Sequence, residues 1–129
     1  MNDVLNIENW KIFEYKDIFE IKKGYYNKKP PHTLEGDIPF IGATQFNNGV
    51  TEYYNIEDIK NYEKSGTQKY DNLENKLFDG NCIVVINNGS VGYAFYQNKK
   101  FTCSHDVNPL YLKHHTLNKI HCNVFKNYN

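Results

Sequence analysis

Residues 82–96 read CIVVINNGSVGYAFY, two apolar runs separated by a short polar segment. The first run, CIVVI at 82–86, is mostly β-branched and is typical of a strand buried on both faces. The polar NNGS at 87–90 favours a tight turn, because Asn and Gly tolerate positive φ angles. The stretch therefore predicts a β-hairpin whose tip carries amide and hydroxyl groups but little charge.

The composition predicts a single folded domain over residues 1–129. Hydrophobic residues make up 40% of the chain and aromatic residues 16%, which argues against disorder and allows a core to be buried. The 15 Lys and Arg residues balance 15 Asp and Glu residues, so any basic surface must be local. All of the positive charge is lysine, which excludes the bidentate contact of Arg with guanine.

The sequence shows no signal peptide, and its apolar runs are too short to span a bilayer. Its three cysteines are widely spaced and form no CxxC pair. We therefore expect a cytoplasmic protein that does not contact the membrane.

The rest of the chain predicts short strands and few helices. The expected elements are strands at 10–15, 19–22, 36–43, 101–107 and 109–113, a turn at 16–18, a helix at 55–60 and weak helical spacing at 116–129. Pro39 favours an edge position or the beginning of its strand, and Asn55 suits a helix N-cap. The predicted fold class is α+β, a twisted mixed or antiparallel sheet with short flanking helices.

Two further segments have residue types that suit nucleic acid. YYNKKPPH at 25–32 sets tyrosines beside lysines in what its prolines predict to be an exposed loop. Bases stack on tyrosine rings, and lysines neutralise phosphates. TQFNNGV at 44–50 is a second amide cluster that follows a strand, and Asn or Gln can pair with adenine in the major groove. A solvated loop and ordinary turn chemistry are the alternative interpretations of the two segments.

Catalytic and metal-binding interpretations are weaker. NPLY at 108–111 departs from the NPPY motif of amino-methyltransferases, and no Gly-rich cofactor turn accompanies it. Glu74 and Lys76, with Asp58, have the residue types of a Mg²⁺-dependent nuclease, but a solvated polar face is the simpler interpretation. Consecutive residues on a strand point to opposite faces, so the SHD at 104–106 cannot form a catalytic relay.

Histidines and cysteines near the C-terminus match no structural zinc spacing. The residues concerned are Cys103, His105, His114, His115, His121 and Cys122. We expect no catalytic residue, no metal and no cofactor, and we favour a binding function.

Five segments in order resemble the target recognition domain of the specificity subunits of type I restriction–modification systems and of related restriction systems. They are Trp10 opening a strand, the Lys-rich loop after Gly24, DIPFIGATQFNNGV at 37–50, LFDGNCIVVINNGSVGYAFY at 77–96 and FTCSHDVNPLYL at 101–112. The resemblance covers about residues 10–117, and the hairpin segment is its most specific part.

The resemblance implies a non-catalytic module whose loops enter the DNA major groove and read one half of a split target. It also implies partners, a DNA adenine methyltransferase subunit and a restriction subunit, which carry out the chemistry. Family members typically carry two such domains separated by long spacer helices. Only one domain is recognised here, and the spacer helix and second domain are not, so we expect a truncated product, half of a split subunit or a cloned domain.

The expected DNA contacts are of three kinds. Phosphate contacts are expected from Lys22, Lys23, Lys28, Lys29, Lys99 and Lys100. Base-edge contacts are expected from Gln45, Asn47, Asn48, Asn87, Asn88 and Ser90. Tyr25 and Tyr26 would stack or pack on sugars, with Asn27 in the same loop.

We expect these amide-rich connections to meet at one rim of the sheet with the lysines nearby, and we expect at least one adenine in the half-site. Two alternatives stay open. The chain could be a decoy or protein-interaction module within a restriction complex, or a Mg²⁺-dependent nuclease at Glu74 and Lys76.

Overall fold

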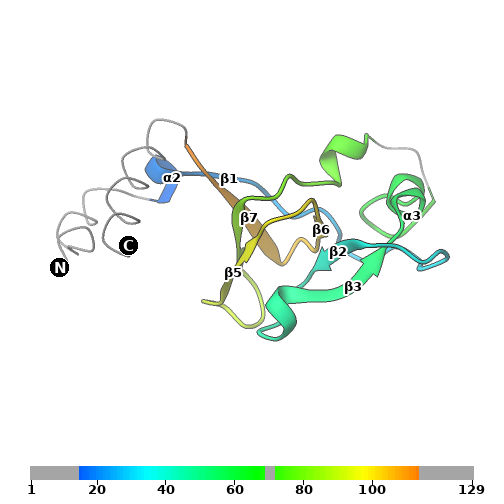
Figure 1. The fold of residues 1–129 in the computed structure, drawn as a ribbon, viewed down its shortest axis with the longest axis horizontal. Coiled ribbons are helices and arrows are strands. Elements are labelled where there is room, and N and C mark those ends of the chain that lie inside the picture. The colour runs from blue at the N-terminus through cyan, green and yellow to red at the C-terminus, as the bar shows by residue number, and fades with distance from the viewer. Residues whose placement is uncertain (1–14, 69–71, 114–129) are drawn as a thin grey trace. The chain divides into compact units, whose positions relative to one another are not determined.

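The computed structural model describes residues 15–68 and 72–113 (Figure 1). The chain divides into two compact units, one formed by Met1–Ile21 with Leu110–Asn129 and the other by Lys22–Pro109. Short strands and a few short helices make up both, so the α+β prediction is confirmed. The candidate site lies entirely in Lys22–Pro109, which we call the recognition unit.

The first unit contains α2 (Tyr15–Ile18), β1 (Phe19–Ile21) and the second half of β7 (Val107–Leu112). Strand β1 pairs with β7 in antiparallel register, with Phe19 opposite Leu112. The strand predicted at 19–22 is confirmed, whereas the turn predicted at 16–18 belongs to a single helical turn. The strand predicted at 10–15 lies outside the described residues except for its last residue, which is helical. The C-terminal helical spacing also lies outside them.

A three-stranded mixed sheet forms one part of the recognition unit. Its strands are β2 (Ile38–Ile41), β3 (Val50–Tyr54) and β6 (Thr102–Cys103), in the order β3-β2-β6. Strand β2 is therefore central, and the edge position considered for Pro39 is wrong. Pro39 is instead the second residue of the strand. Pairing with β6 begins only at Phe40, so no bond to β6 requires an N–H from Pro39.

The hairpin predicted at 82–96 is confirmed. Strand β4 (Cys82–Ile86) pairs antiparallel with β5 (Ala94–Gln97), and β7 begins on the other side of β4. The two-sided burial predicted for β4 is wrong, because Cys82, Val84 and Ile86 are buried while the two residues between them are only half-buried. One face of this hairpin therefore packs into the core, and the other is partly open.

Strand β3 was not among the strands expected from the sequence. Alternate residues of its VTEYY sequence point outward, and only its last residue, Tyr54, is fully buried. Helix α3 (Ile56–Asn61) follows, and Asn55 caps it as predicted, with its Oδ1 accepting the Glu57 N–H at 2.9 Å. The described helices η2 (Asn47–Gly49) and η3 (Leu73–Asn75) are single 3-10 turns.

Aromatic rings form the core beneath the three-stranded sheet. Phe40 lies 5.9 Å from Tyr26 and 5.7 Å from Tyr54, measured between ring centres, and Ile59 of α3 completes the cluster. The Tyr26 hydroxyl donates to backbone carbonyls at the end of α3. The prediction of a fully exposed loop at 25–32 is therefore wrong at Tyr26 and at Pro30, which are both buried.

Candidate nucleic-acid interface

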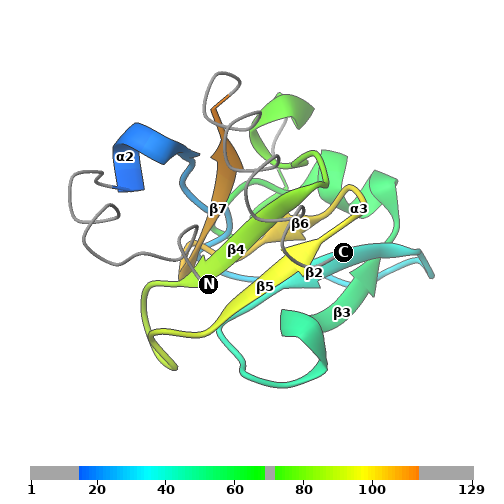
Figure 2. The ribbon, with the colours of Figure 1, turned by 60° about the vertical axis from the view of Figure 1, so that its left-hand side comes forward.

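Two connections rich in amide side chains lie on either side of strand β5 and touch at one point. One joins β2 to β3 over residues 43–49, and the other joins β4 to β5 over residues 87–93. The Asn48 side chain donates to the Tyr96 carbonyl at 3.1 Å, and the Gln97 side chain donates to the Asn48 carbonyl at 3.0 Å. In Figure 2, η2 lies beside β5, and the β4–β5 turn lies beyond the other end of that strand. The two connections approach each other at Ala43, whose side chain would lie 3.4 Å from a Cβ added at Gly89. The prediction that they gather at one rim therefore holds for the beginning of the first connection and not for Asn48.

A third connection, between β6 and β7 at residues 104–106, is bonded to the second. The Asn87 backbone N–H donates to the Asp106 carbonyl at 2.8 Å, and the Asn87 side chain donates to the His105 carbonyl and the Asn108 side chain. The Asn88 side chain donates to the Asp106 carboxylate at 3.2 Å. We call residues 43–49, 87–93 and 104–106 the rim. Hydrogen bonds join the second and third connections, and the first connection touches the second where Ala43 lies beside Gly89.

Left-handed backbone explains why asparagine occurs in the first connection. Asn47 and Asn48 have φ angles of 53° and 56°, and Gly49 follows at 79°. Asn and Gly are the residues that adopt this region most readily. The Asn47 side chain also donates to the Val50 carbonyl at 3.0 Å. Asparagine therefore shapes the turn here, as the alternative interpretation held, and only part of each amide group is left for a ligand.

The rim exposes apolar side chains that the sequence analysis did not single out. Phe46 is 69% exposed and Val91 is 67% exposed, and Tyr93 is also exposed. Gln45 lies beside Phe46 with its side chain in solvent, while Ser90 is half-buried. The sequence did contain a signal for the exposure of Phe46, because a large apolar side chain in a predicted surface turn has no core to pack into.

The lysines do not gather around the 87–93 turn, so the expectation that they lie near both amide-rich turns is wrong there. Lys100 pairs with Asp79 at 2.9 Å, at the beginning of β4, whereas the 87–93 turn follows the end of β4. A five-residue strand separates these two places by about 17 Å. Lys29 pairs with Glu52 at 2.9 Å in another part of the unit, and the Lys28 stem packs beside Gly66.

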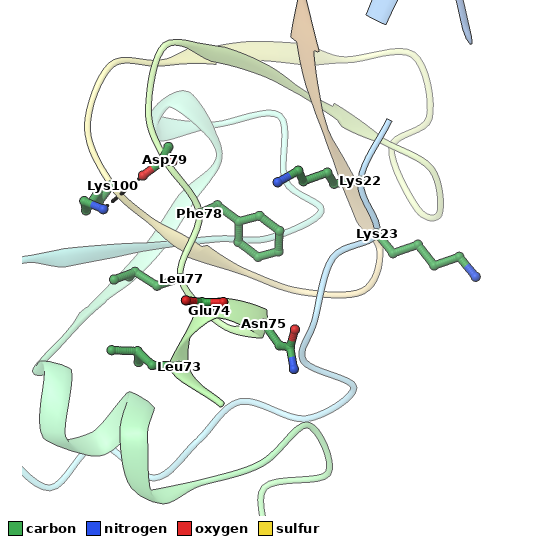
Figure 3. Close-up of a pocket in the computed structure, with 9 residues that line it drawn as sticks. All are labelled: Lys22, Lys23, Leu73, Glu74, Asn75, Leu77, Phe78, Asp79 and Lys100. Carbon is green, nitrogen blue, oxygen red and sulfur yellow. Dashed lines mark hydrogen bonds and ion pairs between the residues drawn. The ribbon is translucent and has the colours of Figure 1, made fainter. Parts of the chain in front are cut away.

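Three of the lysines line a pocket of about 710 Å³, which is shown in Figure 3. Lys22, Lys23 and Lys100 contribute the cationic groups, and Glu74 and Asp79 contribute carboxylates. The Lys22 side chain points toward the centre of the pocket, whereas the Lys23 side chain points away from it. The ion pair between Lys100 and Asp79 holds the pKa of that carboxyl below its ordinary value. The pocket therefore mixes both charge signs.

The tyrosine loop splits into buried and accessible residues. Tyr26 is only 1% exposed, so the prediction that its ring stacks or packs on DNA is wrong. Tyr25 is half-buried and meets Tyr26 edge-on at 4.8 Å between ring centres. Asn27 is exposed, and its backbone N–H donates to the Lys64 carbonyl. Of these three residues, only Tyr25 and Asn27 are accessible to a ligand.

Asp58 and Lys76, two residues of the nuclease interpretation, are buried and form hydrogen bonds that stabilise the fold. Asp58 is 2% exposed and accepts hydrogen bonds from the backbone of Thr33 and Leu34 and from the Thr33 hydroxyl. Burial alone would raise the pKa of Asp58, but these hydrogen bonds outweigh it and hold the pKa below its ordinary value. Lys76, which was predicted to lie on a solvated face, is 0% exposed and donates to the carbonyls of Ile59 and Lys60, each at 3.0 Å.

The SHD segment at 104–106 also forms a turn and not a relay. The Ser104 hydroxyl accepts the Asp106 backbone N–H at 3.1 Å, which commits it to the backbone. Within residues 15–68 and 72–113, no group of three His, Cys, Asp or Glu side chains could hold a metal ion. In the same part of the chain, no helix is long and apolar enough to cross a membrane.

Comparisons with known proteins identify the relatives of this chain. The family described as "Type I restriction modification DNA specificity domain" matches residues 7–128. The chain is 39% identical over 111 residues to the type II restriction enzyme BgcI specificity subunit S.BcgI of Heyndrickxia coagulans, covering 86% of this chain and 27% of that protein. The chain thus spans about a quarter of the length of this curated relative.

A solved structure of an S subunit from a type I restriction–modification system of M. genitalium is also similar. The match covers 97% of this chain and 33% of that one, with 18% identity and a TM-score of 0.48.

Proposed function

Because the chain belongs to the family of type I restriction modification DNA specificity domains, we propose that it reads a short sequence in double-stranded DNA for a restriction–modification system. Members of this family supply specificity and not catalysis. The proposal concerns how this chain reads DNA, which of its residues make contact and which proteins it guides.

The observation that carries the proposal is that hydrogen bonds to neighbouring segments fix the rim connections in place. Asn48 bonds the first connection to β5, and Asn87 and Asn88 bond the second to residues 104–106. Such cross-links fix the loop geometry before a ligand arrives, so less conformational entropy is lost on binding. A fixed surface of polar and apolar side chains suits the direct reading of base edges in a major groove.

Base contacts are proposed for the amide and hydroxyl side chains of the rim. Gln45 is exposed and has no hydrogen bond to any described residue, so its whole amide can meet a base. Each asparagine amide carries two N–H donors and one carbonyl oxygen, so an internal bond leaves part of the group available. The proposed base-contacting residues are Gln45, Asn47, Asn48, Asn87, Asn88 and Ser90.

Phosphate contacts are proposed away from the rim, where the lysines are. Lys29 pairs with the half-buried Glu52 and Lys100 with the exposed Asp79; ion pairs near the surface are worth little, so a phosphate can replace the carboxylate. Tyr25 and Asn27 would contact sugar or phosphate beside Lys28 and Lys29, which follow them in the chain. The proposed phosphate-contacting residues are Lys22, Lys23, Lys28, Lys29, Lys99 and Lys100.

The partners and the setting are part of the proposal. We expect the chain to read one half of a split target and to guide a DNA adenine methyltransferase subunit and a restriction subunit. We also expect it to act in the cytoplasm, where bacterial DNA is accessible. The domain organisation proposed is one recognition domain over residues 1–129.

A binding selection tests the proposal. The full chain is incubated with random duplex DNA, with and without a methyltransferase subunit, and bound duplexes are sequenced over several rounds. We expect one short motif to be enriched, and fluorescence anisotropy should show tighter binding to it than to a shuffled duplex at the same salt concentration. Equal affinity for the selected and shuffled duplexes would contradict sequence-specific reading.

A further inference from the structure

Phe46 lies at the tip of the first rim connection, where backbone hydrogen bonds keep its side chain in solvent. The Phe46 N–H donates to the Thr44 hydroxyl at 3.2 Å, and the Phe46 carbonyl accepts the Gly49 N–H at 2.9 Å. The Gly49 carbonyl in turn accepts the Gly42 N–H at 2.9 Å, which closes the base of the loop. The exposure of Phe46 is therefore set by the loop and does not result from a loose segment.

The neighbouring connection adds apolar surface. Val91 and Tyr93 are exposed there, and the Tyr93 ring stacks on Phe95 at 6.5 Å between centres. At Gly89, an added Cβ would lie 3.4 Å from the Ala43 side chain, so the beginning of the first connection touches the turn of the second. Isolated apolar residues at a surface are ordinary, but several on two joined connections mark a contact surface.

From this arrangement we infer that Phe46 is a specificity-determining residue that contacts the C5 methyl group of a thymine in the major groove, while Gln45 beside it pairs with an adenine. The inference rests on the proposed function and deepens it. An A·T pair offers both partners at once, because adenine presents N7 and N6 to an amide and thymine presents a methyl group to an apolar side chain.

The charges at the rim favour A·T over G·C at this position. The first two connections, 43–49 and 87–93, contain no lysine, and the chain contains no arginine. Cationic side chains make the commonest specific contact with guanine O6 and N7, and these connections cannot supply one. An amide followed by a phenyl ring matches the acceptor, donor and methyl pattern of A·T.

Replacing thymine by deoxyuridine tests the inference, because this change removes only the methyl group. The probe is the duplex selected by the full chain from a random library, with each thymine replaced in turn by deoxyuridine. With the unsubstituted chain, one replacement should weaken binding about threefold to fivefold, which corresponds to the burial of one methyl group. Replacements at the other thymines should have little effect.

The variant Phe46→Ala couples the effect to the residue. It should bind the thymine duplex more weakly than the unsubstituted chain does and should no longer distinguish thymine from deoxyuridine at the sensitive position. Leu34→Ala is the matched control, because Leu34 is also an exposed apolar residue but lies in the loop held by Asp58. That variant should keep the full response to deoxyuridine, and both variants should keep the unfolding temperature of the unsubstituted chain.

The outcomes separate the two levels of the argument. If no motif is enriched, sequence-specific reading fails and the inference fails with it. If a motif is enriched but lacks thymine, or if every deoxyuridine duplex binds as tightly as its thymine counterpart, only the inference is overturned. Unchanged DNA binding by Phe46→Ala would also overturn it and would assign this ring to a protein partner.

Discussion

Gln97 of strand β5 is bonded to Asn48 of the first connection, the Gln97 side chain donating to the Asn48 carbonyl at 3.0 Å. The Asn48 side chain donates to the carbonyl of Tyr96, the residue that precedes Gln97. Strand β5 is at the edge of its sheet, and unpaired edges invite association with other chains. This exchange therefore covers part of the edge and fixes the first connection against it.

Gln97→Ala should destabilise the unit. The buried Gln97 amide would be lost, and the Asn48 carbonyl would lose the donor that it has, at a cost of about 1–3 kcal/mol in unfolding free energy. Urea denaturation followed by circular dichroism measures this. Gln45→Ala removes an exposed amide from the same connection and should change the unfolding free energy by less than about 0.5 kcal/mol. Equal losses in the two variants would contradict the role of Gln97.

Asn47 offers a test of the left-handed turn. Its φ of 53° suits glycine, so Asn47→Ala should be less stable than Asn47→Gly by about 1 kcal/mol. Both variants lose the bond to the Val50 carbonyl, so their difference isolates the backbone term. Thermal unfolding of the two variants measures it. If alanine proved as stable as glycine, the backbone at this position would not be left-handed in solution.

Asp58 should make stability depend on pH at the acid end. Its folded pKa lies below its ordinary value, so folding retains the full contribution of this carboxylate above the unfolded pKa of about 3.9. The contribution should then be lost as the pH falls through the lower folded value. Urea denaturation between about pH 2 and pH 6 should show this decline, and Asp58→Asn should flatten it.

Asp79 provides the control for that series. The pKa of Asp79 is also lowered, first by the hydrogen bond from Lys100 and then by the charge of Lys100, but Asp79 is solvent-exposed. Water and salt screen such a pair, so Asp79→Asn should alter the acid limb much less than Asp58→Asn does. The reverse order would mean that the buried hydrogen bonds to Thr33 and Leu34 do not stabilise the fold.

Lys76→Met should destabilise the unit although it removes a charge from the interior. The Lys76 ammonium group satisfies two carbonyls at the end of α3, and helix ends leave such groups without partners. We expect a loss of about 2 kcal/mol or more in unfolding free energy. Lys99→Met, at an exposed position, is the matched control and should be close to neutral. Chemical denaturation of both variants gives the comparison.

Lys23→Ala should weaken DNA binding alike for all sequences. Each lost phosphate contact should reduce the slope of log K against log salt concentration by about 0.9. Anisotropy titrations at several salt concentrations, on the selected and shuffled duplexes, measure both effects. A loss confined to the selected duplex would instead make Lys23 a base-reading residue.

Local patterns predicted the hairpin and the Asn55 cap, because residues adjacent in sequence determine turn and cap geometry. Strand β3 was missed because only one of its faces is buried, and its outward side chains read as a polar segment. The burial of Tyr26 and Lys76 was also missed. The acceptors of both lie at the end of α3, more than fifteen residues away along the chain, where no local pattern can indicate them.

The candidate site was predicted in outline and misjudged in detail. That the two amide-rich connections would approach each other was expected because each follows a strand, and they do so at Ala43 and Gly89. The sequence could not show that the asparagine side chains would form hydrogen bonds within the protein, because Asn suits both turns and base contacts. Nor could it place the lysines, whose long side chains settle beside Asp79, Glu52 and Gly66 only once the chain is folded.

The left-handed corner at residues 47–49 determines the shape of the loop, whereas residues 45 and 46 present its exposed side chains. The side chains of Gln45 and Phe46 are exposed, whereas the corner behind them accepts few residue types because its φ angles are positive. New target preferences can therefore arise by replacing two side chains without refolding the domain. Divergence among close homologues should concentrate at positions 45 and 46 and spare the asparagine–glycine corner.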